Sequence, residues 1–225
     1  MTRYRIGEAT RREEDDRLLR GRGRYLDDVV CLNQTHAYFL RSSHAHANIN
    51  TVDISEAAIR PGVLLVLTGK EYLERGLGRQ VPVQSFKRRD GTDGFVTPQP
   101  LLAIDRVRYI GEQVVLVVAE TIAQAKDAAE LIEVDYEPLP VVTSVLDAAE
   151  AGAPLVFEEC PDNEAYFFSV GSAEKVSAQF EKADHIVQNR LVINRIAANS
   201  IEPRGCLAEY DPDEDRYTLR ATIQS

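Results

Sequence analysis

A short buried strand followed directly by a capped helix most limits how this chain can fold. Residues 113–119 read QVVLVVA, an apolar run typical of a buried strand. Ile110-Gly111-Glu112, just before it, indicates a turn or a bulge. A strand needs neighbours for its backbone groups, so we expect other strands of the chain to lie beside this one.

The helix predicted after this strand is amphipathic. Thr121 and Gln124 have capping-box spacing, which indicates where the helix begins. Its apolar face carries Ile122, Ala125, Ala129 and Ile132, and the alanines allow close packing on a sheet. EVDYEPLP at 133–140 is then a strand that its two prolines end. Residues 113–140 are thus predicted to form a strand–helix–strand unit.

Further strands are predicted upstream of this unit. Residues 35–41 and 47–54 read as strands, and PGVLLVLTG at 61–69 reads as a third after a short helix capped by Ser55. Strands and helices follow one another over about 115 residues, a usual domain size. The sequence therefore predicts a compact α+β domain at 25–139.

A helix and a long polar loop follow the third of these strands. Thr68 and Glu71 have capping-box spacing, so a helix is predicted from there to near Gly76. Residues 76–100 are polar and rich in Gly and Pro, without periodicity. A stretch of this length is functional, interfacial or mobile.

A second region is predicted to begin near Gly171 with a helix, followed by a strand from about His185 to Asn194. One face of the helix carries Ala173, Val176, Ser177 and Phe180. RGCLAEY at 204–210 and RYTLRATIQS at 216–225 alternate apolar and polar residues, and DPDED between them favours a turn. A lone hairpin is marginal in water, so we expect this α+β region to be incomplete.

Four parts are therefore expected along the chain. They are an N-terminal arm at 1–24, the α+β domain at 25–139, a connector at 140–170 and the incomplete region at 171–225. The arm carries eight arginines against five acidic groups. The whole chain has a net charge of −10, which disfavours binding to nucleic acid or to an anionic membrane.

The cysteines and the apolar runs of the sequence indicate the cellular compartment. Cys31, Cys160 and Cys206 form no C-x-x-C pair and are odd in number, which fits a reducing cytoplasm. The longest apolar run, at 114–119, is far too short to span a bilayer, and no signal peptide is recognised. A cytoplasmic, soluble protein is predicted.

Several side chains are candidates for chemistry, each with a plainer alternative. His44 and His46, two apart on a strand, could begin a zinc or copper site, but no third ligand is evident and structural histidines are favoured. Glu112 is either a general base or, more in keeping with its place beside Gly111, the cap of a turn.

Two charged motifs and one glutamine also have two interpretations each. Lys87-Arg88-Arg89 either grips a phosphate or a partner, or is a solvated loop tip, which we favour. Glu202-Pro203-Arg204 forms a salt bridge or lines a pocket before the hairpin. Gln224 lies on the polar face of the last strand, where a surface role and a ligand contact are equally open.

Several stretches taken together resemble a known family. LLRGRGRYLDD at 18–28, YFLRSSHAHANI at 38–49, DRVRYIGEQVVLVVAET at 105–121 and ADHIVQNRLVINRIAANSIEPRGCLAEYD at 183–211 are similar to the start of the large molybdenum subunit of the xanthine dehydrogenase, carbon monoxide dehydrogenase and aldehyde oxidase family. The resemblance implies an α/β-hammerhead domain followed by an incomplete α+β portion of the molybdopterin-binding domain.

The resemblance also implies a function. Members hydroxylate a carbon centre or oxidise carbon monoxide at a molybdenum held by molybdopterin cytosine dinucleotide, and their substrates include purines, aldehydes and N-heterocycles. Electrons pass to iron-sulfur and FAD centres, often on separate small and medium subunits. Gln224, in TIQS, matches a glutamine that donates a hydrogen bond close to the molybdenum oxo group, so it is the one candidate cofactor-binding residue.

The family's catalytic glutamate and glycine-rich loops match nothing in these 225 residues. The resemblance therefore predicts a truncated chain or one piece of a split subunit, with no catalytic residue, metal ligand or cofactor of its own and no activity alone. The expected partners are the remainder of the large subunit, the FAD and iron-sulfur subunits, and a possible second copy. The alternatives are a stand-alone interaction module on a hammerhead scaffold, or a small hydrolase using Glu112 or His46.

Overall fold

Two compact units make up the computed structural model, which describes residues 7, 12–82, 86–193, 196 and 199–223. One unit comprises residues 35–186, and the other joins residues 1–34 to residues 187–225. Each unit is described by itself. None of the helices in the described part of the chain is long and apolar enough to cross a membrane.

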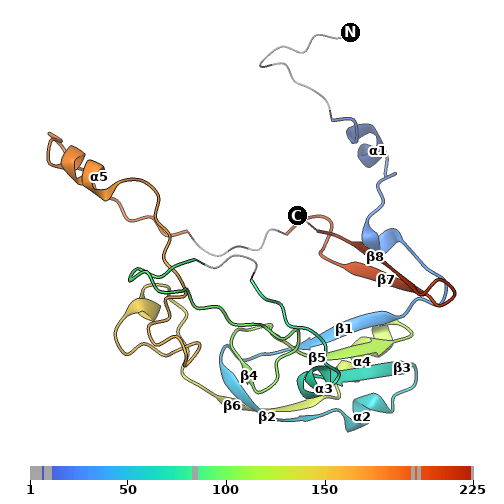
Figure 1. The fold of residues 1–225 in the computed structure, drawn as a ribbon. Helices are drawn as coiled ribbons and strands as arrows, with labels where there is room; N and C mark the ends of the chain where they lie inside the picture. Colours follow the sequence, from blue (N-terminus) through green and yellow to red (C-terminus); the bar gives the residue numbers. More distant parts are fainter. Residues whose placement is uncertain (1–6, 8–11, 83–85, 194–195, 197–198, 224–225) are drawn as a thin grey trace. The chain divides into compact units, whose positions relative to one another are not determined.

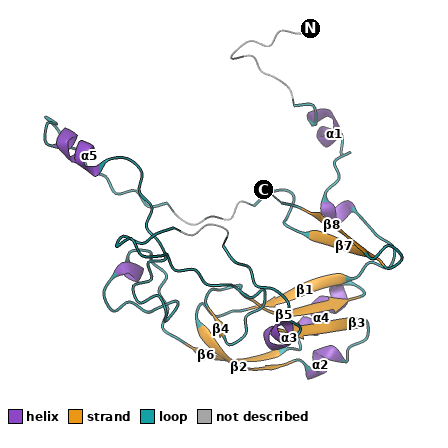
Figure 2. Ribbon diagram, in the orientation of Figure 1, coloured by secondary structure: helices purple, strands orange, loops and turns teal. Residues whose placement is uncertain are grey.

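The larger unit contains two antiparallel three-stranded sheets (Figures 1 and 2). The first has the order β1-β5-β3, formed by β1 (His36–Arg41), β5 (Gln113–Ala119) and β3 (Val63–Thr68). The second has the order β4-β2-β6, formed by β4 (Arg106–Val107), β2 (Ala47–Asp53) and β6 (Glu133–Pro138). The strands expected at 35–41, 47–54, 61–69, 113–119 and 133–140 are thereby confirmed within two residues at each end.

The central strand β5 pairs with β1 along one edge and with β3 along the other, and its side chains pack in two clusters. Val117 is opposite Tyr38 on one side and Val66 on the other, and Leu116 is opposite Phe39 and Leu67. The row with Val117 belongs to the main core, which also takes in Ala125, Ala128 and Ala129 of helix α4 (Ile122–Ala129). The alanine face predicted for this helix therefore packs on the sheet as expected, although Ile122 stays exposed.

The opposite row of the sheet packs in a smaller cluster of buried residues. Leu67 joins Tyr72 and Leu102, with Phe39 and Leu116 packed against them. Tyr72 belongs to helix α3 (Gly69–Glu74), whose capping box is complete: the Thr68 hydroxyl accepts the Glu71 N–H, and the Glu71 carboxylate accepts the Thr68 N–H. This confirms the start that the Thr68 and Glu71 spacing predicts.

Helix α2 (Ser55–Ala58) begins at Ser55 itself. If Ser55 were the N-cap, the helix would begin one residue later. Ile54 occupies the cap position and makes no side-chain bond, while the Asp53 carboxylate accepts the Ser55 N–H at 2.9 Å. Ser55 is thus the first helical residue, and the prediction that it caps the helix is wrong. The Asp53 side chain thus satisfies the N–H of Ser55 itself, which is a different donor from the later N–H groups that a Ser55 cap would satisfy.

Beyond the sheets, residues 140–170 contain one 3-10 turn, Asp147–Ala149, and lead to helix α5 (Ala173–Phe180). Val176 and Phe180 on the expected apolar face of α5 are both exposed. The strand expected from about His185 to Asn194 is wrong over residues 185–193, which have no regular structure, and Asn194 lies outside the described residues. No strand of the described chain pairs with this stretch, so its backbone has no ladder to join.

The smaller unit contains the predicted hairpin, formed by β7 (Cys206–Asp211) and β8 (Arg216–Ala221), with Tyr210 opposite Tyr217. A short helix α1 (Asp15–Leu19) and a 3-10 turn, Leu26–Asp28, belong to the same unit. The Glu202 carboxylate accepts the Leu26 N–H at 3.0 Å, a contact that the sequence did not predict.

The second region exposes much apolar surface, as expected for an incomplete region. Every residue of β8 is exposed, including Tyr217 and Leu219, and Val187, Leu191, Val192 and Ile193 are each more than three-quarters exposed. Contiguous apolar surface of this kind marks an interaction site.

Gly69 provides a test of the packing between α3 and the loop before β4. An alanine methyl there would overlap the Ala103 carbonyl oxygen and lie 3.1 Å from the Ile104 Cα. Because the obstacle is backbone, Gly69→Ala should lower the free energy of unfolding by about 1–3 kcal/mol. Urea denaturation measures this change. Gly78→Ala is the matched control, because a methyl at Gly78 meets nothing within 4 Å; equal effects of the two substitutions would contradict the packing.

Candidate functional site

The residues singled out for chemistry come together where β1 ends and the turn before β5 begins. Ser42 is buried directly after β1, and its N–H donates to the Glu112 carbonyl at 2.8 Å. Its carbonyl accepts the Gly111 N–H at 2.8 Å. This pair of backbone bonds joins the SSHAHA segment to the RYIGE turn, two stretches about 65 residues apart in the chain.

Glu112 caps its own turn. One carboxylate oxygen, Oε2, accepts the Arg108 N–H at 2.5 Å, and the residue is only 8% exposed. Burial raises the pKa of Glu112, while the bond from the Arg108 backbone and the positive charge of its guanidinium lower it in part. The turn-cap interpretation is therefore confirmed, and the carboxylate that a general base would need is engaged with backbone.

The two histidines are also engaged within the fold. The His44 ring lies against Tyr136, with centroids 4.7 Å apart. His46 Nδ1 lies 2.9 Å from the Pro140 carbonyl oxygen. Among the described residues, no group of three or more His, Cys, Asp or Glu side chains is placed to hold a metal ion. Since Glu112 and His46 are both bound to backbone, the hydrolase hypothesis fails.

Arg108 links the same turn to the connector. Its Nε donates to the Val156 carbonyl at 3.1 Å, and its guanidinium lies 4.4 Å from the centre of the Phe157 ring. Burial lowers the pKa of Arg108, and the nearby Glu112 carboxylate opposes this effect. Arg108 therefore ties the connector to the hammerhead-like sheets through a hydrogen bond and a cation–π contact.

The basic run of the 76–100 loop forms a second link to the connector. Arg88 pairs with Asp162 and is only 20% exposed, and Arg89 pairs with Glu164 at 3.0 Å. Backbone bonds accompany the ion pairs: Phe95 N–H donates to the Ala165 carbonyl at 2.7 Å, and Phe167 N–H donates to the Lys87 carbonyl at 2.9 Å. The expectation of a solvated loop tip is wrong for Arg88, because acidic residues more than 70 positions later lie against it.

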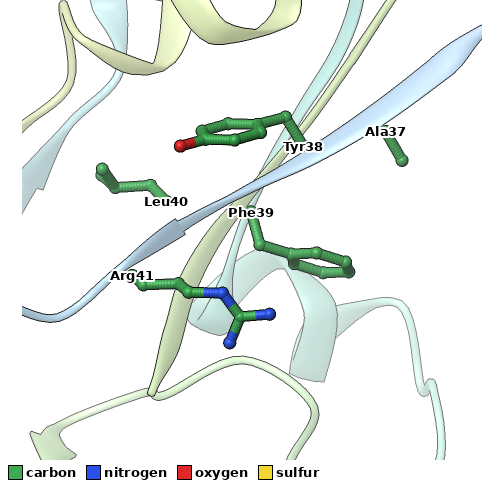
Figure 3. Close-up of a pocket in the computed structure, with 5 residues that line it drawn as sticks. All are labelled: Ala37, Tyr38, Phe39, Leu40 and Arg41. Carbon is green, nitrogen blue, oxygen red and sulfur yellow. The ribbon is translucent and has the colours of Figure 1, made fainter. Parts of the chain in front are cut away.

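The two best-formed hollows of the described chain do not resemble an enzyme pocket. The larger, about 350 Å³, is lined by consecutive residues 37–41 of β1 alone (Figure 3). Tyr38 and Leu40 point to one side of that strand, and Phe39 and Arg41 point to the other. The smaller, about 20 Å³, lies between His46, Arg108 and the connector. Neither gathers several polar groups around a space that fits a pterin nucleotide.

Gln224, the predicted cofactor contact, lies outside the described residues. It follows β8, whose described residues end the smaller unit. The structure thus places Ser42, His44, His46, Arg108 and Glu112 together, and Gln224 belongs to the other unit by its sequence position. Sequence reasoning missed Arg108 and Ser42, although both stand inside the motifs that carry the resemblance.

Comparison with known proteins identifies both parts of the chain. Residues 20–140 match the family described as aldehyde oxidase and xanthine dehydrogenase, a/b hammerhead domain. Residues 156–225 match the molybdopterin cofactor-binding domain. The chain is 40% identical to the nicotine 6-hydroxylase large subunit of Paenarthrobacter nicotinovorans over 224 residues, which cover 100% of this chain and 26% of that protein.

Solved structures of similar proteins share the fold. Reconstituted CO dehydrogenase from Oligotropha carboxidovorans superposes with a TM-score of 0.77 at 33% identity, over 96% of this chain and 27% of that one. Quinoline 2-oxidoreductase from Pseudomonas putida 86 superposes with a TM-score of 0.73 at 35% identity, over 96% and 26%. The chain therefore spans about a quarter of the length of the relatives it matches.

The raised pKa of Glu112 gives a pH-dependent prediction. The folded protein holds this proton more tightly than the unfolded chain, so the contribution of Glu112 to the free energy of unfolding falls as pH rises from its ordinary pKa of 4.5 through the raised value. Glu112→Gln removes the titration and keeps an oxygen for the Arg108 N–H. The stability of the wild type relative to Glu112→Gln should therefore decline as the pH rises from 4.5.

Urea denaturation across this pH range measures the difference, and Glu112→Ala is the comparison variant. The alanine leaves the buried Arg108 N–H without its acceptor, so we expect a loss of about 1–3 kcal/mol at every pH. If the difference in free energy of unfolding between the wild type and Glu112→Gln does not vary with pH, the carboxyl group is not desolvated.

The Arg88–Asp162 pair is tested by charge reversal. Arg88→Glu places two carboxylates together, so we expect the free energy of unfolding to fall and residues 162–168 to become more sensitive to protease. Asp162→Arg in the same chain should restore both. Lys87→Glu is the control, because the Lys87–Asp93 pair lies within the loop. If Lys87→Glu also made residues 162–168 more sensitive to protease, the result would argue against a specific link between Arg88 and the connector.

Proposed function

Because the chain belongs to the aldehyde oxidase and xanthine dehydrogenase family through its a/b hammerhead domain, we propose that it is the N-terminal part of the large, molybdenum-carrying subunit of an oxidoreductase. The observation that carries the proposal is the order of the two family matches, with the hammerhead domain at 20–140 and the molybdopterin cofactor-binding domain at 156–225. The related large subunit from Paenarthrobacter and the CO dehydrogenase structure align over almost all of the chain.

The proposed cofactor is molybdopterin, in its cytosine dinucleotide form, and when bound it supplies the molybdenum centre at which the substrate is oxidised. The described residues form no cavity that fits this group, so no step of the reaction is assigned to them. Gln224 is proposed to donate a hydrogen bond from its side-chain amide to the cofactor, as the matching glutamine of the family does. Its position just after β8 supports this role, because the hairpin lies within residues 156–225, which match the molybdopterin cofactor-binding domain.

The hammerhead domain is proposed to shape the approach to the active site and to carry contacts with other subunits. Its own core is complete, with β5 covered on both faces, whereas the second region exposes large apolar side chains on β8 and on residues 187–193. We propose that these side chains pack against further parts of the cofactor-binding domain, since exposed apolar surface is stabilised by such burial.

The proposed partners are an FAD-binding medium subunit and an iron-sulfur small subunit, which take electrons from the molybdenum centre. The printed name of the Paenarthrobacter relative, a large subunit, supports an assembly of several chains. The arrangement of Cys31, Cys160 and Cys206 also supports a separate iron-sulfur subunit, because all three are free thiols in different places along the chain. No feature of the described residues favours a stand-alone interaction module instead.

Intact mass and molybdenum content of the protein purified from its source test the proposal. We expect this sequence within a polypeptide, or a tight complex, much heavier than 25.1 kDa, together with bound molybdenum. A native chain of 25.1 kDa, free of molybdenum and of partners, would overturn the proposal and favour the interaction module.

Gln224→Glu in the complete enzyme tests the proposed cofactor contact. Replacing the amide donor with a carboxylate removes the hydrogen bond and adds a negative charge, so we expect kcat to fall by about 10²-fold with molybdenum content retained. Steady-state kinetics and metal analysis measure the two quantities. Thr218→Val on the exposed strand β8 is the control. Unchanged kinetics of Gln224→Glu would remove the assigned role.

A further inference from the structure

One nitrogen of His46 is buried without a partner. The Pro140 carbonyl, 2.9 Å from Nδ1, can only accept a hydrogen bond, so Nδ1 carries the proton in the neutral ring and Nε2 is left as an acceptor. Nε2 is buried and has no hydrogen-bond partner among the described residues. Buried polar atoms in native proteins almost always have a partner, either protein or ordered water.

A small cavity lies directly against this ring. It has a volume of about 20 Å³ and is lined by Ala45, His46 and Arg108 on one side and by residues 140–142 and 154–156 of the connector on the other. One water molecule needs a cavity of about 10–15 Å³ on the same measure. The space is therefore large enough for a single water.

The walls of the cavity provide the polar partners that a water needs. Nε2 of His46 accepts one hydrogen bond from the water. The Arg108 guanidinium has five N–H donors, of which Nε–H donates to Val156. Arg108 lines the cavity, so its remaining guanidinium N–H groups are the candidate donors to a water oxygen there. Buried waters make about three such bonds, and this cavity combines a donor group with an unused acceptor.

We propose that an ordered water molecule occupies this cavity, donates to His46 Nε2 and accepts from Arg108, and so fastens the connector to the hammerhead domain. The site gives His46 and Arg108 a shared role that neither a metal site nor general-base chemistry explains. It lies where the chain leaves the hammerhead match, which ends at residue 140, and approaches the cofactor-binding match, which begins at residue 156.

A metal ion is a poorer occupant of the same space. The guanidinium of Arg108 would face the cation at close range, and no carboxylate lines the cavity to balance the two charges. A metal ion would need further ligands such as a second imidazole, whereas a water does not. The other histidine of the segment, His44, packs against Tyr136 instead. The two occupants differ in their distance from the ring: about 2.7–3.2 Å for a water and about 2.0–2.1 Å for zinc.

A crystal structure of the protein in its native assembly, at a resolution that shows ordered water, tests the proposal directly. We expect one density peak at hydrogen-bond distance from His46 Nε2 and no anomalous signal. An empty cavity, or a metal at ligand distance, would overturn the proposal. This result depends on no substitution and does not depend on whether Gln224 contacts the cofactor.

His46→Phe and His44→Phe form a matched pair of variants, since each replaces an imidazole with a ring. His46→Phe should lose the water and speed hydrogen exchange of the Leu139 amide several-fold, because that N–H donates to the His46 carbonyl at 2.9 Å beside the cavity. His44→Phe should keep both the water and the slow exchange, because His44 does not line the cavity. Loss of the water without faster exchange would overturn the fastening role.

Discussion

The burial of β5 on both faces is the constraint on which the larger unit depends. The strand lies between β1 and β3 in one antiparallel sheet, and its side chains enter two separate clusters. Val115, Val117 and Ala119 meet helix α4 and the second sheet, whereas Leu116 meets the residues around α3. A register slip of one residue would exchange these two sets, so packing on both sides fixes the register strongly.

The turn before this strand has backbone groups that are hydrogen-bonded within the fold. Those groups explain why residues that look catalytic in the sequence act structurally. Ser42 bonds across to Gly111 and Glu112, and the Glu112 carboxylate accepts the Arg108 N–H. The His46 ring is likewise engaged with backbone, because its Nδ1 bonds to the Pro140 carbonyl. Buried backbone groups must find partners, and short polar side chains in tight turns provide them.

Sequence patterns were sufficient to predict a helix start where the capping hydrogen bonds join residues close together in the chain. The Thr68–Glu71 box and the Thr121 cap are each contained within four residues, and both helices begin where predicted. The partners of Arg88 and Glu202 are 74 and 176 residues away, and no pattern near either residue specifies them. The stretch from His185 has apolar residues suited to a strand, yet a strand is defined by its neighbour, and none of the described strands lies beside it.

Gln224 could be proposed only through the family resemblance, because the alternation of apolar and polar residues over 216–225 is that of any amphipathic strand. The two units also differ in what stabilises them. In the larger unit, large side chains of β5 are withdrawn from water by elements within the same 152 residues, 35–186. In the smaller unit, β7 and β8 have cross-strand pairs such as Tyr210–Tyr217 but no covering layer over β8. A hairpin of this kind gains order from what packs on it, so the precision of a cofactor contact after β8 depends on that packing rather than on the hairpin itself.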